Sequence, residues 1–84
     1  MFEVEIFDPE KRVFKGRIKF MLVPGKDGFF GILKDHAPML SVLASGRLRL
    51  DDEEVSKSFE ISGGFLEVDN NRVIILTDSA KAVA

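Results

Sequence analysis

The single histidine of the chain, His36, is its one side chain suited to general acid–base chemistry near neutral pH. A Ser-His-Asp triad would need this imidazole between a carboxylate and a serine such as Ser41 or Ser45. Neither serine lies in the Gly-x-Ser-x-Gly pattern that presents a nucleophile on a tight turn. Because the chain has no cysteine, thiolate catalysis, disulfides and cysteine-based zinc sites are excluded. We expect a protein that is not an enzyme.

Two further patterns suggest ligands, but their spacing does not fit. The acidic run at residues 51–54 lacks the glycine and the alternating ligand positions of an EF-hand calcium loop, so a solvated hairpin tip is expected. Gly25, Gly28 and Gly31 recur at intervals of three. A phosphate-binding loop would also need a Lys-Ser or Lys-Thr pair and a following helix, and neither is predicted here. We therefore expect turn glycines, no cofactor and no bound metal.

Composition narrows the choice of partner. The chain has 84 residues, of which 12 are Lys or Arg and 14 are Asp or Glu, giving a net charge of −2. This balance argues against nucleic acid or an anionic lipid surface, because both attract a strong excess of basic charge. A small β-barrel module that binds nucleic acid is the alternative, although the basic side chains stand singly rather than clustered beside stacking aromatic residues. The acidic, alternating N-terminus is unlike a signal peptide, so the chain is expected in the cytoplasm.

Alternation of apolar and polar residues with a period of two runs through the whole chain and predicts short β-strands. Turn signals separate the strands at residues 8–11, 24–28 and 69–71. The Ser62-Gly63-Gly64 segment is expected to break the strand ladder. Ile18, Phe20 and Leu22 are expected to share one face of their strand.

These strands and turns predict an all-β fold, a β-sandwich or flattened barrel of about ten short strands. The domain is expected to cover residues 1–78, followed by a short tail at residues 79–84. The tail has a composition that favours helix, but so few residues cannot hold a helix alone.

Some strands carry apolar side chains on both faces. In the last predicted strand Val73 and Ile75 share one face and Ile74 and Leu76 the other, and Phe65 likewise faces away from its apolar neighbours. Either another protein covers the outward set, or loops form a second small core over it.

Two local features also have a structural and an interaction reading. One of Phe29 and Phe30 must face outward if the segment is a strand, and an outward phenylalanine beside glycines is typical of an interface anchor. His36 either hydrogen-bonds to the backbone and stiffens the turn before Pro38, or contacts a partner.

Three groups of residues together carry a family resemblance. The central group is Val23-Pro24-Gly25, Gly28, Gly31-Ile32-Leu33 and His36-Ala37-Pro38-Met39-Leu40. The second is Ser62-Gly63-Gly64-Phe65-Leu66-Glu67-Val68 with Val73-Ile74-Ile75-Leu76-Thr77-Asp78. The opening group is Asp8-Pro9-Glu10 followed by Phe14-Lys15-Gly16. In this order and spacing, which spans essentially the whole chain, they resemble the epsilon subunit of F-type ATP synthases.

The resemblance implies the β-sandwich of that family and a non-catalytic role in the rotor, or central stalk. Such a subunit couples the gamma subunit to the ring of c subunits in proton- or sodium-driven ATP synthesis. The resemblance implies c-ring contacts for Asp27, Gly28, Phe29 and Phe30. It implies gamma contacts for His36, Met39 and Ser41. It further implies no cofactor, no nucleic acid, and a peripheral position at the cytoplasmic face of the bacterial inner membrane, reached only through the complex.

Three departures from the family pattern bear on these expectations. Phe29 stands where the family often has an acidic residue, so a polar contact to the ring is replaced by an apolar one. Lys34-Asp35 replaces the usual Pro-Gly before the histidine. The sequence stops at Ala84, where typical members continue into a helical hairpin that carries ATP-dependent inhibition. Either the chain is a short member without the C-terminal helical hairpin, which we expect, or it is the β-domain of a longer member.

Overall fold

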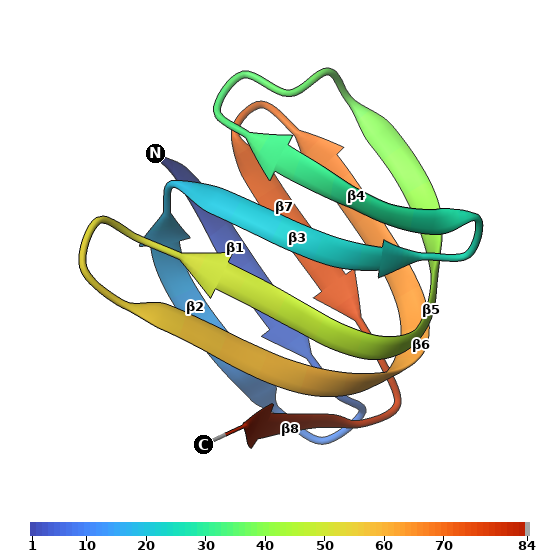
Figure 1. The fold of residues 1–84 in the computed structure, drawn as a ribbon. Helices are drawn as coiled ribbons and strands as arrows, with labels where there is room; N and C mark the ends of the chain where they lie inside the picture. The colour runs from blue at the N-terminus through green and yellow to red at the C-terminus, as the bar shows by residue number, and fades with distance from the viewer. Residues whose placement is uncertain (84) are drawn as a thin grey trace.

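Eight β-strands make up all the regular structure of residues 1–83, the part of the chain that the computed structural model describes (Figure 1). The strands are β1 (Phe2–Phe7), β2 (Arg12–Ile18), β3 (Phe20–Gly25), β4 (Gly28–Leu33), β5 (Met39–Asp51), β6 (Ser56–Asp69), β7 (Arg72–Leu76) and β8 (Ala80–Val83). The predicted all-β fold is confirmed. The described part of the chain forms fewer strands than the roughly ten expected. The strands β5 and β6 are long, with 13 and 14 residues, and each runs through segments that the alternation pattern divides into shorter strands. Residues 1–83 contain no helix long and apolar enough to cross a membrane.

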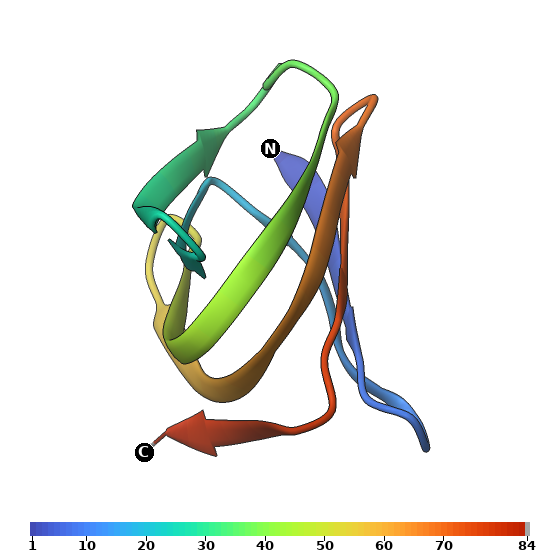
Figure 2. The same ribbon diagram turned by 90° about the vertical axis from the view of Figure 1, so that its right-hand side faces the viewer.

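The β5–β6 hairpin belongs to both layers of the fold. The strands follow the order β2-β1-β7-β6-β5-β3-β4, and β8 pairs with β6 beside that path. Residues 65–69 of β6 pair with β7, whereas residues 58–61 pair with β8. Figure 2 shows the two long strands curving from one layer into the other. The layer of β1, β2 and β7 therefore lies across the core from that of β3 and β4.

β6 bends at Gly63 and Gly64 rather than ending there. Their φ angles are +93° and +134°, which glycine adopts without steric penalty. Pairing with β5 continues on both sides, with Leu43 opposite Gly64 and Ser45 opposite Ser62. The break predicted in the ladder is thus a bend, through which one strand serves two layers.

A single core lies between the layers, filled by alternate residues of the strands. The buried apolar side chains are Phe2, Val4, Ile6, Ile18, Met21, Val23, Ile32, Leu43, Leu48, Leu50, Phe59, Ile61, Leu66, Val68, Val73 and Ile75. Because interiors of this kind pack like organic crystals, the domain has low compressibility.

The inward face shifts by one residue between β2 and β3. Ile18 and Met21 are both buried, so the prediction that Phe20 continues the face of Ile18 is wrong. The chain turns a corner at Lys19, whose N–H donates to the carbonyl oxygen of Asp51 over 2.8 Å. Beyond this corner the odd-numbered residues Met21 and Val23 face the core instead of the even-numbered ones. No local sequence pattern predicts this change.

Residues 80–83, expected to lie in a tail, form strand β8 and pair with β6 from Ser58 to Ile61. The N–H of Ser62 also donates to the carbonyl oxygen of Ser79 over 3.1 Å. The composition of this segment favours helix, but the ladder of β6 supplies it with backbone partners that a lone short segment lacks. The expected boundary at residue 78 therefore does not coincide with the end of the sheet, and residue 84 lies outside the described residues.

Candidate protein-interaction surface

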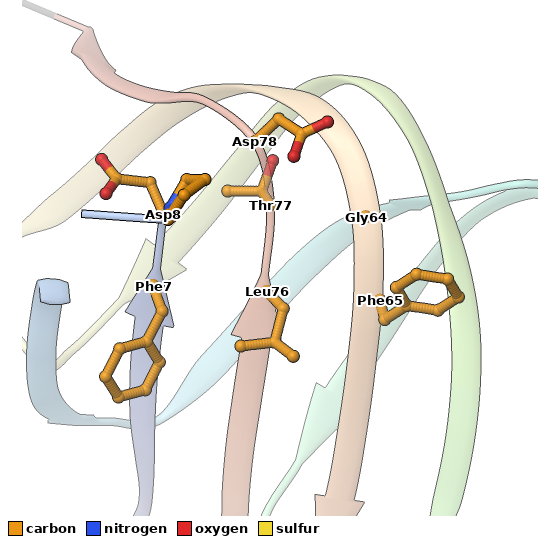
Figure 3. A pocket seen from close by; sticks show the side chains of 8 residues that line it. Phe7, Asp8, Gly64, Phe65, Leu76, Thr77 and Asp78 are labelled. Atoms are coloured by element: carbon orange, nitrogen blue, oxygen red, sulfur yellow. The ribbon is translucent and has the colours of Figure 1, made fainter. Parts of the chain in front are cut away.

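One row of apolar side chains crosses four neighbouring strands on the outer face of the first layer. The register places Val42 opposite Phe65, Phe65 opposite Leu76, and Leu76 opposite Phe7. Residues that are directly opposite in a sheet point to the same side. Phe65 is 62% exposed, Leu76 53% and Val42 47%, while Phe7 is half-buried. Figure 3 shows Phe7, Leu76 and Phe65 on adjacent strands.

A second row runs parallel to the first. From β5 to β1 its members are, in order, Leu40, Glu67, Ile74 and Glu5, each directly opposite the next. Leu40 is 79% exposed. Glu5 is paired with Arg12 at 3.2 Å and Arg72 at 3.5 Å. We call the apolar members of the two rows the outer strip: Phe7, Leu40, Val42, Phe65, Ile74 and Leu76. The prediction that Ile74 and Leu76 lie on the face opposite to Val73 and Ile75, and that Phe65 opposes its apolar neighbours, is confirmed, and the structure shows that their face is the outer one.

A hollow of about 280 Å³ deepens one end of the outer strip (Figure 3). Its wall includes Phe7, Phe65 and Leu76, and its rim carries the carboxylates of Asp8 and Asp78. This end of the strip therefore combines an apolar wall with negative charge.

The β3–β4 hairpin forms another part of the surface. Phe29 is 61% exposed, whereas Phe30 packs against the core, so the prediction that one of the pair faces outward is confirmed. A second hollow, of about 490 Å³, lies between this hairpin and the start of β5. It is lined by six of the seven residues that the sequence singles out: Asp27, Gly28, Phe29, Phe30, Met39 and Ser41. Leu40 and Val42 also line it, so this hollow is continuous with the outer strip.

His36 lies apart from the other six. Its ring Nδ1 is 2.7 Å from the carbonyl oxygen of Ala37, a distance at which a protonated Nδ1 donates. Its backbone N–H donates to the carbonyl oxygen of Leu33 over 3.3 Å. These contacts fit the interpretation in which His36 hydrogen-bonds to the backbone and stiffens the turn before Pro38. The loop is also tied to the β6–β7 turn by hydrogen bonds between Asp35 and Asn71.

Nothing in this arrangement assembles a reaction centre from the described residues. His36 and Ser41 line different hollows and Ser45 lines neither of them, so the histidine is not brought together with the serines weighed for a triad. Within residues 1–83 no three His, Asp or Glu side chains gather as a metal site would require. What the geometry offers is an exposed apolar surface on four paired strands.

The sequence patterns assign neither Leu40 nor Val42 to an interaction surface. Both belong to an apolar run beginning at Met39, but nothing local shows that they stand beside Phe65. That neighbourhood depends on the register of β5 against β6, which follows from the long hairpin.

Residues 1–83 match the sequence profile of the family described as ATP synthase, delta/epsilon chain, beta-sandwich domain. The chain is 45% identical over 78 residues to the ATP synthase epsilon chain of Chlorobium limicola, covering 92% of this chain and 89% of that protein. It is also 45% identical over 75 residues to the epsilon chain of Leptospira borgpetersenii, covering 89% of this chain but only 59% of that protein. The chain thus spans little more than half the length of some relatives.

Solved structures share the fold. A chain in the Euglena gracilis mitochondrial ATP synthase (OSCP/F1/c-ring) superposes with a TM-score of 0.88 at 24% identity, over 94% of this chain and 51% of that one. A chain in the central stalk and c ring of the Tetrahymena thermophila mitochondrial enzyme gives 0.80 at 21% identity, over 93% and 63%. At such identities the likeness concerns the fold alone.

Proposed function

This chain belongs to the delta/epsilon chain family of ATP synthase, and from that premise we propose that it is a non-catalytic subunit of the central stalk. In this role it binds the gamma subunit and the ring of c subunits, and so couples ion flow to ATP synthesis carried out elsewhere in the complex. The chain acts by adhesion and holds no cofactor.

The observation that carries this proposal is the outer strip. Small monomeric proteins rarely leave adjoining rows of large apolar side chains exposed unless a partner covers them. The strip is built on four paired strands, so its side chains are held in fixed positions before binding. A preorganised surface loses little conformational entropy on association. We assign the strip to the gamma subunit.

The β3–β4 hairpin is assigned to the c ring. Its turn offers Lys26 and Asp27 to polar loops, and Phe29 supplies an exposed aromatic anchor. Met39 and Ser41, assigned to gamma, line the same hollow as this hairpin. That hollow would therefore lie where gamma and the ring meet. His36 would contact gamma at the far end of the β4–β5 loop, with its ring fixed by the backbone.

A rotor subunit must also transmit torque without deforming. The single close-packed core and the long hairpin shared by both layers suit this task, because a dense interior resists compression. The subunit would meet the membrane only through the complex, at the cytoplasmic face of the bacterial inner membrane.

The alternative, a nucleic-acid module, fits the charge distribution poorly. Arg47 pairs with Glu60 and Arg49 with Asp51, each over 3.1 Å. Arg49 also lies over the Phe20 ring, 5.7 Å from its centre. Arg47 and Arg49 are thus already engaged with acidic or aromatic side chains rather than free to contact a phosphate backbone.

Native mass spectrometry of the affinity-tagged chain, isolated with its complex from the source cells, tests the proposal. We expect the chain together with gamma and the c ring. Recovery of the folded chain without either subunit would contradict it, and a salt-sensitive shift of labelled single-stranded DNA would favour the alternative instead.

A further inference from the structure

A single carboxylate interrupts the outer strip. Glu67 is exposed on the outer face of β6, between Leu40 on β5 and Ile74 on β7. Among residues 1–83 it takes part in no ion pair. Arg72 on β7, the neighbouring strand, and Arg12 on β2 both contact another acid, Glu5.

This position makes the carboxylate decisive once the strip is covered. A partner that seals Leu40 and Ile74 also removes water from Glu67. An ionised carboxylate without water or a partner is strongly destabilised, whereas one that meets a cation is stabilised by a charge-assisted hydrogen bond. A purely apolar partner surface is therefore rejected at this point, and a cationic one is selected.

We propose that Glu67 is a specificity-determining contact, and that the gamma segment covering the outer strip presents a lysine or arginine to it within an otherwise apolar surface. The inference rests on the proposed function, since it names the chemistry of the gamma surface.

The charges around the strip favour the same chemistry. Asp8 and Asp78 stand on the rim of the hollow at one end, and Asp69 follows Glu67 on the same face of β6. Arg12 and Arg72 are already paired with Glu5. The exposed Lys15 and Arg17 lie on β2, which β1 and β7 separate from Glu67 on β6. A segment with an apolar centre and basic flanks complements this face, whereas an acidic segment or an anionic lipid surface is repelled by it.

The test is a titration of the purified gamma subunit with three variants. Glu67→Gln keeps the shape and removes the charge, and Glu67→Lys reverses it. Glu54→Lys makes the same change of net charge at the exposed β5–β6 turn, away from the strip. We expect Glu67→Gln to weaken binding about tenfold and Glu67→Lys about a hundredfold or more, while Glu54→Lys stays within about twofold of the unmodified chain.

Salt dependence provides a readout that loss of packing would not change. The affinity of the unmodified chain should fall with rising salt more steeply than that of Glu67→Gln, because screening weakens only the charged contact. A lysine or arginine of gamma changed to glutamate should then restore binding to Glu67→Lys. Equal affinity and equal salt dependence for the unmodified chain and Glu67→Gln would overturn this inference alone. No binding of gamma by the folded unmodified chain would overturn the proposed function, and this inference with it.

Discussion

Asp35 and Asn71, which lie on different loops, bind each other through two hydrogen bonds. The N–H of Asp35 donates to Oδ1 of Asn71 over 2.7 Å, and Nδ2 of Asn71 donates to Oδ1 of Asp35 over 3.0 Å. The carbonyl oxygen of Asn71 also accepts from the N–H of Glu3 over 3.0 Å. One turn residue thus joins the β4–β5 loop, which carries His36, to β1 and to the β6–β7 turn.

The paired hydrogen bonds of Asp35 and Asn71, which we call the clamp, predict that substitutions of two neighbouring asparagines change stability by different amounts. Asn70 and Asn71 both have positive φ, at 52° and 60°, a conformation that glycine also accepts. We expect Asn71→Gly to lower the free energy of unfolding by about 1 kcal/mol, because it removes the two side-chain hydrogen bonds. Asn70→Gly should change it by less than about 0.5 kcal/mol. Urea unfolding measures both, and an equal loss in the two variants would show that the clamp contributes nothing.

A second matched pair concerns glycines. Gly64 and Gly28 have nearly the same φ, at 134° and 130°. A Cβ at Gly64 would collide with the carbonyl oxygen of Leu76, whereas one at Gly28 would meet nothing within 4 Å. We expect Gly28→Ala to cost about 1–2 kcal/mol from backbone strain and Gly64→Ala about 3 kcal/mol or more. Thermal unfolding compares them, and similar melting temperatures would refute the close approach of β6 and β7.

The two phenylalanines of the β3–β4 hairpin should separate binding from stability. Phe29 is exposed, so Phe29→Ala should change the free energy of unfolding by less than about 0.5 kcal/mol. Phe30 packs against the core, and Phe30→Ala should lower it by about 2 kcal/mol. Phe29→Asp should weaken association with the c ring by about 2 kcal/mol if this loop is the contact. Undiminished binding of the c ring by Phe29→Asp would place the contact elsewhere.

The hydrogen bonds of the β5–β6 turn predict that the stability of the chain depends on pH in the acidic range. Hydrogen bonds from the N–H groups of Glu54 and Val55 hold the pKa of the Asp52 carboxyl below its ordinary value of 3.8. A carboxyl with a lowered pKa contributes stability above the unfolded-state value, and that contribution is lost as the pH falls through the folded-state value. We expect the stability of the unmodified chain to decline below about pH 4 more than that of Asp52→Asn, whose amide oxygen still accepts both bonds but does not titrate. Parallel pH profiles from guanidinium unfolding would contradict this.

Much of the fold follows from local rules. The alternation in β1 predicts its buried face, and Asp69-Asn70-Asn71 predicts the β6–β7 turn, because such residues accept positive φ. The inward shift after Lys19 and the pairing of residues 80–83 were not predictable, since both depend on where a distant strand supplies hydrogen bonds.

The site was predictable only in pieces. The outward side chains of Phe65, Ile74 and Leu76 follow from alternation, but their joining with Leu40 and Val42 follows from register. Likewise the sequence separates Phe29 from Met39, while the β3–β4 hairpin folds back so that both line one hollow. Sequence patterns indicate which side chains face outward, whereas the sheet decides which of them adjoin.

The central claim is that the outer strip binds gamma, and calorimetric titration of purified gamma with a matched pair of variants tests it most directly. Phe65→Asp places a charge in the strip, and Val55→Asp places one at a similarly exposed apolar residue in the β5–β6 turn. We predict saturable binding of the unmodified chain and of Val55→Asp, and at least about thirtyfold weaker binding of Phe65→Asp. Absence of binding by the folded unmodified chain, or equal affinities for all three proteins, would contradict the claim.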